Sequence, residues 1–134
     1  MAKLTTVEGI GNVQAEKLAG AGIGTTDALL EQGSTPQGRQ ALADETGIDP
    51  GLLLAWINRV DLFRISGIGE EYSDLLEEAG VDTVPELARR NPENLYQTIV
   101  EVNSNKKLVR QLPGQDQVKR WIEQAKDLPR VIEY

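Results

Sequence analysis

The side chains of this chain that could take part in chemistry are carboxylates and lysines. Its 134 residues contain no histidine and no cysteine, which excludes histidine-activated nucleophiles, thiolate metal sites and disulfides. The adjacent carboxylates are Asp44-Glu45, Glu70-Glu71 and Glu77-Glu78. Neighbours on a helix point about 100° apart, so the two members of such a pair cannot face each other across a substrate. We therefore predict a protein that is not an enzyme and that has no catalytic residue, metal site or cofactor.

Two glycine turns suggest a different chemistry, the binding of a phosphate. Residues 7–11 and 65–69 both read hydrophobic-x-Gly-hydrophobic-Gly and lead directly into a helical pattern. The glycines allow backbone angles that a β-carbon forbids, so the chain can reverse its direction there. The N–H groups after the second glycine would lie at a helix N-terminus, where they can bind a phosphate, and the turn carbonyls could hold a monovalent cation. The alternative is that both turns only join helices tightly.

The charge of the chain opposes binding to a polyanion. Fourteen basic residues stand against 21 acidic ones, a net charge of −7, and an acidic surface repels phosphate backbones. Residues 104–134 are the exception, with seven basic and four acidic residues. The alternative for this basic segment is a solvated surface that pairs with the protein's own carboxylates.

The two turns also differ in charge. The first turn is followed by Asn12 and Val13, which are neutral, and by Lys17 further along. The second is followed by Glu70 and Glu71, which favour the helix dipole but occupy the place of a phosphate. The first turn is therefore the better candidate for a phosphate site.

The chain is an internal repeat. At a shift of 58 positions residues 7–11 align with 65–69, and at a shift of 65 positions Trp56 aligns with Trp121. The second copy therefore carries seven extra residues, between about 91 and 117. We divide the chain into a first repeat at 1–63 and a second repeat at 64–134, and we expect both tryptophans to lie in the core.

The elements are expected to be short helices throughout. Apolar residues follow the i, i+3, i+4, i+7 pattern in 53–60 and again in 118–125, which is typical of a helix with one buried face. Asp49-Pro50 and Asn91-Pro92 are typical of helix starts, and Thr83 to Glu86 has capping-box spacing. Four glycines are expected to end helices in the left-handed conformation: Gly22, Gly33, Gly47 and Gly80.

Two further classes of protein are excluded by the sequence. Residues 39–58 have the spacing of a helix-turn-helix, but the outward positions of its second helix carry no side chain that could read a base edge. No apolar run is long enough to span a bilayer, and residues 1–21 lack a signal-peptide core. We expect a cytoplasmic protein without a membrane partner.

Particular segments resemble known families. Residues 9–18 look like the hairpin of the tandem helix-hairpin-helix class found in DNA-repair and recombination proteins. Residues 67–76 and 81–87, with 106–110 and 128–134, resemble a bacterial domain-of-unknown-function family, family 4332. The resemblance implies an all-α fold in which two tandem helix-hairpin-helix units pack as one compact helical domain with a pseudo-two-fold internal repeat. It also implies DNA binding, by analogy of fold.

We therefore predict a non-enzymatic helical binding module that makes weak, sequence-independent contact with a nucleic-acid backbone. The alternative is a protein-interaction or scaffolding domain whose hairpins are purely structural; a ligand pocket between the repeats is a third hypothesis, and no small-molecule substrate is inferred. The isoleucine of each turn is expected to fill the groove between the helices that it joins. The candidate nucleic-acid-binding residues are Gly9, Ile10, Gly11, Asn12, Val13, Lys17, Gly67, Ile68, Gly69, Lys106, Lys107 and Arg110.

Overall fold

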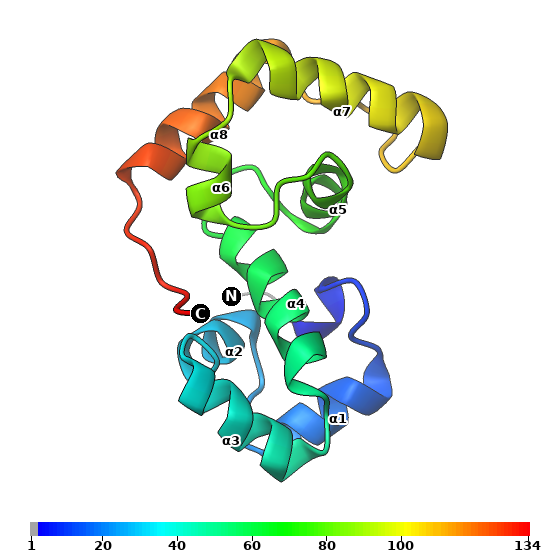
Figure 1. Cartoon of the computed structure of the whole chain (residues 1–134). Helices are drawn as coiled ribbons and strands as arrows, with labels where there is room; N and C mark the ends of the chain where they lie inside the picture. The colour runs from blue at the N-terminus through cyan, green and yellow to red at the C-terminus, as the bar shows by residue number, and fades with distance from the viewer. Residues whose placement is uncertain (1–2) are drawn as a thin grey trace. The chain divides into compact units, whose positions relative to one another are not determined.

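A computed structural model describes residues 3–134, and every regular element in that range is helical (Figure 1). The all-α prediction is therefore confirmed. One isolated antiparallel bridge joins Lys3 to Thr25. The described part of the chain has no helix with both the length and the apolar character needed to cross a membrane. The elements are η1 (Leu4–Thr6), α1 (Asn12–Gly20), α2 (Thr26–Gln32), α3 (Pro36–Thr46), α4 (Pro50–Leu62), α5 (Glu70–Glu78), α6 (Val84–Ala88), α7 (Pro92–Lys106) and α8 (Gln115–Asp127).

The chain divides into two units by its internal contacts. The first unit comprises Met1–Asp61 together with Val131–Tyr134, and the second comprises Leu62–Arg130. The last four residues of the chain thus pack with the first unit. The boundary that we expect between the sequence repeats, after residue 63, stays a prediction.

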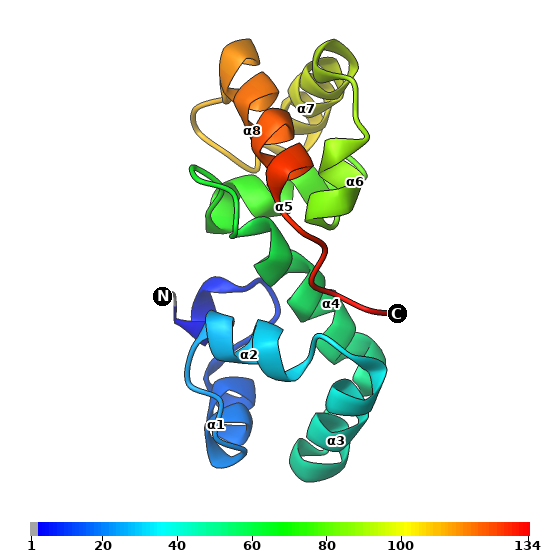
Figure 2. The ribbon, with the colours of Figure 1, turned by 90° about the vertical axis from the view of Figure 1, so that its left-hand side faces the viewer.

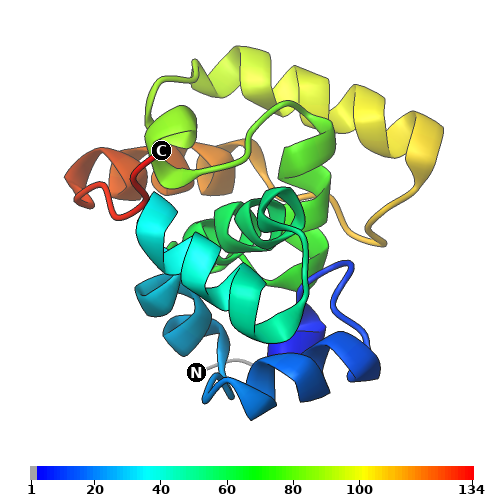
Figure 3. The same ribbon diagram turned by 60° about the horizontal axis from the view of Figure 1, so that its bottom comes forward.

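In the first unit, the starts of the helices are fixed by short polar side chains. The hydroxyl of Thr25 accepts a hydrogen bond from the N–H of Ala28 at 3.2 Å at the start of α2. Thr35 does the same for α3, and the Asp49 carboxylate accepts from two N–H groups at the start of α4. Each such bond satisfies a donor that a helix start leaves unpaired. Figure 3 shows η1 beside α1 and α2 beside α3, in agreement with the contacts between these pairs.

The buried face of α4 forms the centre of the first unit. Leu53, Trp56, Ile57 and Val60 are all buried, as the helical spacing predicts. Gly33 packs against Ile57, and a β-carbon at Gly33 would overlap the end of the Ile57 side chain. The expectation that Gly33 ends its helix in the left-handed conformation is wrong, because its φ is −99°. Close packing explains this glycine, whereas Gly22, Gly47 and Gly80 do have positive φ.

The second unit has one apolar core to which α5, α6, α7 and α8 contribute. Helix α8 packs against α6 and α7, and Figure 2 shows it alongside them. Trp121 lies on its buried face and meets Tyr72 with ring centroids 5.3 Å apart. Thr83 and Asn91 cap α6 and α7 through the N–H groups of Glu86 and Asn94, as their sequence signatures predict.

Candidate phosphate-binding turns

The first glycine turn, residues 7–11, reverses the chain between η1 and α1. Within the turn, the N–H of Ile10 donates a hydrogen bond to the Val7 carbonyl at 3.1 Å. Gly9 has φ +95°, and a β-carbon there would lie 2.9 Å from Nε1 of Trp56. Glycine is therefore required at position 9 for two reasons: the positive φ and the close approach of the indole ring.

Helix α1 follows this turn, and three N–H groups at its N-terminus have no acceptor within residues 3–134. Gly11 is the N-cap residue and has no side chain to close the helix start. The first helical bond runs from Ala15 to Gly11 at 3.0 Å, so the N–H groups of residues 12–14 precede it. Asn12 and Val13 are exposed, and the first helical turn of α1 contains no carboxylate. These donors lie at the positive end of the helix dipole, which is the arrangement that anions bind.

The second glycine turn, residues 65–69, has the same backbone. Ile68 donates to Ile65 at 3.2 Å, and Ser73 donates to Gly69 at 2.9 Å as the first helical bond of α5. Gly67 has φ +93°, and a β-carbon there would lie 3.2 Å from Nε1 of Trp121. Gly69 also lacks a side-chain cap. In each turn, the first glycine thus packs against the tryptophan of a later helix.

The electrostatic surroundings of the two turns differ as the sequence indicates. Glu70 and Glu71 occupy the first turn of α5 and are exposed. Their carboxylates satisfy the helix dipole and repel a phosphate. Both turns therefore lead into a helix start without a side-chain cap. Only the first helical turn of α1 has no carboxylate, although the exposed Glu8 lies within the glycine turn that precedes it.

The isoleucines of the two turns are core residues. Ile10 and Ile68 are buried, with 4% and 5% of their surface exposed. Their side chains hold the turns in place and do not face solvent. Of the candidate residues, these two therefore offer almost no surface to a bound molecule.

The basic candidates lie in different units. Lys17 follows the first glycine turn on α1, is exposed, and makes no hydrogen bond or ion pair with the described residues. Lys106, Lys107 and Arg110 belong to the second unit. Lys106 pairs with Glu78 at 2.6 Å, whereas Lys107 and Arg110 are exposed and make no such pair with any residue that the structure describes.

A clamp that the sequence analysis missed holds the loop after α7. The Asn103 side chain accepts from the N–H of Val109 at 3.0 Å and donates to its carbonyl at 3.2 Å. The Tyr72 hydroxyl donates to the Gln111 carbonyl at 3.2 Å. The backbone that carries Lys107 and Arg110 is therefore fixed. An asparagine inside a helix gives no sequence signal of this role.

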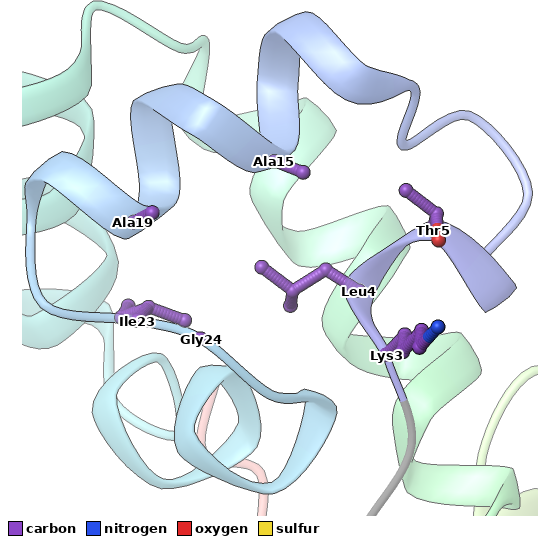
Figure 4. Close-up of a pocket in the computed structure, with 7 residues that line it drawn as sticks. All are labelled: Lys3, Leu4, Thr5, Ala15, Ala19, Ile23 and Gly24. Carbon is purple, nitrogen blue, oxygen red and sulfur yellow. The ribbon is translucent and has the colours of Figure 1, made fainter.

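An apolar hollow of about 230 Å³ lies beside α1 in the first unit (Figure 4). Figure 4 shows Leu4 in the hollow with Ala15 and Ala19 of α1 on one side of it. Only two of the lining side chains are polar, so the hollow offers few groups that could orient a reacting molecule. No group of three or more acidic side chains that could hold a metal occurs within residues 3–134. The hollow is lined by Lys3, Leu4, Thr5, Ala15, Ala19, Ile23 and Gly24.

Comparison with known protein families gives a match over most of the chain. The family described as "Domain of unknown function (DUF4332)" matches residues 8–128 of the chain. No curated protein and no solved structure matches the chain.

Proposed function

The chain belongs to the DUF4332 family, and we propose that it is a non-enzymatic binding module of two tandem helix-hairpin-helix units that form a pseudo-two-fold repeat. Support for the repeat comes from the equivalent positions of the two glycine turns. In both, the first glycine has φ near +95° and lies against a buried tryptophan. In both, the second glycine is the N-cap of the next helix.

We propose that the module makes weak, sequence-independent contact with a nucleic-acid backbone through the turn before α1. The observation that carries this proposal is the set of three N–H groups at residues 12–14, which have no acceptor within residues 3–134 and lie in a first helical turn without a carboxylate. Most other helices here are closed by a side chain: Thr25, Thr35, Asp49, Thr83 or Asn91 caps the start. Main-chain donors bind the phosphate and not the base, so the contact carries no sequence information.

Lysine and arginine side chains would add to this contact. Lys17 is in the same unit as the turn and has no partner among the described residues. Lys107 and Arg110 provide positive charge in the second unit, whereas the charge of Lys106 is partly compensated by Glu78. With few phosphates neutralised and a net charge of −7, the affinity should be low at physiological salt.

The test exchanges the residues that follow the two turns. The double variant Asn12→Glu with Val13→Glu gives the first turn the carboxylates of the second, and we expect it to abolish binding. The reverse variant, Glu70→Asn with Glu71→Val, should strengthen binding because it removes two negative charges from an equivalent helix start. All four positions are exposed, so both variants should fold.

Binding is measured by fluorescence anisotropy with labelled single- and double-stranded DNA and RNA at several salt concentrations. The logarithm of the binding constant should fall with the logarithm of salt concentration by about 0.7–0.9 per phosphate contacted. Equal binding by the wild type and the Asn12→Glu/Val13→Glu variant, or no binding by the wild type at low salt, would refute the proposal.

A protein-interaction domain is the second candidate, and the exposure of Val13 favours it. This side chain is 62% exposed in the first turn of α1, and Leu52 of the same unit is 44% exposed. Val13→Ser separates the two functions, because it removes the apolar side chain and keeps the N–H. Nucleic-acid binding should be unchanged by this substitution. A protein partner whose recovery by affinity purification resists nuclease treatment should, in contrast, no longer be recovered with the variant.

A further inference from the structure

The last four residues of the chain, Val131–Tyr134, occupy a site on the first unit. We refer to these residues as the tail, and to Ser34, Arg39 and Asn58 as the tail-binding site. The N–H of Glu133 donates to the Ser34 carbonyl at 2.7 Å. The Tyr134 hydroxyl donates to the Asn58 side chain at 3.0 Å. Ser34 lies in the connection between α2 and α3, and Asn58 lies on α4.

Arg39 is the centre of the tail-binding site. It is only 6% exposed, which is unusual for an arginine. Its guanidinium donates to the Gly33 carbonyl at 2.8 Å and to the Glu133 carbonyl at 2.7 Å. Both acceptors are main-chain groups, and one of them belongs to the tail. Departure of the tail would leave this buried cation with half of its acceptors.

The tail is recognised as an extended peptide. Residues 128–134 have no regular secondary structure, and the bonds to Ser34 and Arg39 involve the main chain of Glu133. Ile132 adds one buried apolar side chain, 2% exposed. Main-chain pairing supplies affinity and the side-chain contacts supply selectivity, as in other sites that bind extended peptides. None of these contacts requires the tail to come from the same chain.

The connection to the tail can act as a hinge. Helix α8 ends at Asp127, and the Pro129 carbonyl accepts a hydrogen bond from Arg64 at 2.6 Å in the second unit. Between this anchor and the tail lies a single residue, Arg130. A change in the backbone angles there could redirect the tail while both units stay folded. Exchange of one identical segment between two copies is a low-cost route to a dimer.

We propose that the tail is an exchangeable ligand and that the tail-binding site accepts the tail of a second copy of this chain. In the monomer the tail has a high effective concentration, on the order of millimolar for a short connection. The exchanged dimer should therefore form only at high protein concentration, or when the chain's own tail cannot bind.

The test combines two full-length variants that each lack one half of the contact. Ile132→Asp disables the tail and leaves the site intact, whereas Arg39→Met disables the site and leaves the tail intact. Each variant alone should be monomeric by size-exclusion chromatography with light scattering. An equimolar mixture should form a heterodimer, detected by native mass spectrometry, because one intact tail meets one intact site.

A peptide with the sequence of residues 128–134, acetylated and amidated, is titrated into the Ile132→Asp variant as a second measurement. It should bind at least about tenfold more tightly than a scrambled peptide, and the double variant Arg39→Met/Ile132→Asp should lose about tenfold in affinity. If Ile132→Asp does not fold by circular dichroism, Glu133→Pro replaces it, since this change removes the donor to Ser34 without placing a charge in the core.

The outcomes are distinct. Heterodimer formation together with peptide binding supports the exchange. A mixture of two folded variants that stays monomeric overturns it, even where the peptide binds, because the second copy is then not an occupant. Peptide binding that does not depend on sequence or on Arg39 also overturns it.

Discussion

The close approach of Gly9 to Trp56 allows a quantitative test of the first glycine turn. The change is Gly9→Ala, which adds one methyl group. At φ +95° an L-residue is strained, and the new β-carbon would lie 2.9 Å from Nε1 of Trp56. Trp56 is 2% exposed, so the ring has little room in which to move.

The expected loss follows from these two effects. An alanine held at positive φ costs about 1–2 kcal/mol. Overpacking a close-packed interior by one methyl group costs about 1–3 kcal/mol more. Gly9→Ala should therefore lower the free energy of unfolding by about 2–5 kcal/mol. The matched control is Gly22→Ala, since Gly22 has φ +86° and no atom within 4 Å of the added carbon; it should cost only about 1–2 kcal/mol.

Urea unfolding monitored by far-ultraviolet circular dichroism and tryptophan fluorescence measures both variants. Gly67→Ala should fall between them, because its β-carbon would lie 3.2 Å from Nε1 of Trp121 and a small shift could relieve the contact. If Gly9→Ala is no more destabilising than Gly22→Ala, the tryptophan does not support the turn and the reasoning is wrong.

Two further predictions concern the second unit. Asn103→Ala should lower the free energy of unfolding by about 2 kcal/mol, because it removes both hydrogen bonds to Val109; Asn105→Ala, at an exposed position of the same helix, is the control and should change it by less than about 0.5 kcal/mol in urea unfolding. Lys106→Ala should cost less than about 1 kcal/mol, since its ion pair with Glu78 is exposed to solvent. Thermal unfolding at low and high salt checks this. The loss should shrink at high salt, which screens the pair, and a loss above about 1 kcal/mol at low salt would contradict the prediction.

Local rules explain which features of the fold could be predicted from the sequence. Prolines at the first helical position and short polar caps specify helix starts within a few residues, and α4 and α7 begin at Pro50 and Pro92 as expected. Positive φ at Gly47 follows from a helix end that only glycine satisfies without strain.

Features that depend on distant segments could not be predicted in this way. Gly33 is fixed by the side chain of Ile57, which lies on another helix. The role of Arg39 depends on Glu133, 94 residues away in the sequence. Propensity and periodicity report on neighbours along the chain, so neither could indicate that a buried guanidinium binds the tail.

The two glycine turns have the same backbone geometry but are followed by residues of different charge. Both keep a glycine at positive φ against a buried tryptophan, although the charge that follows them differs. The turn shape is therefore explained by packing in both units and is not by itself a sign of phosphate binding. The turns differ in the first helical turn that follows them, which is neutral in α1 and acidic at Glu70 and Glu71 in α5. The exchange of these residues between the two turns isolates that difference, because the backbone and the tryptophan contact stay the same. A gain of binding at the second turn would show that carboxylates alone prevent it from acting as an anion site.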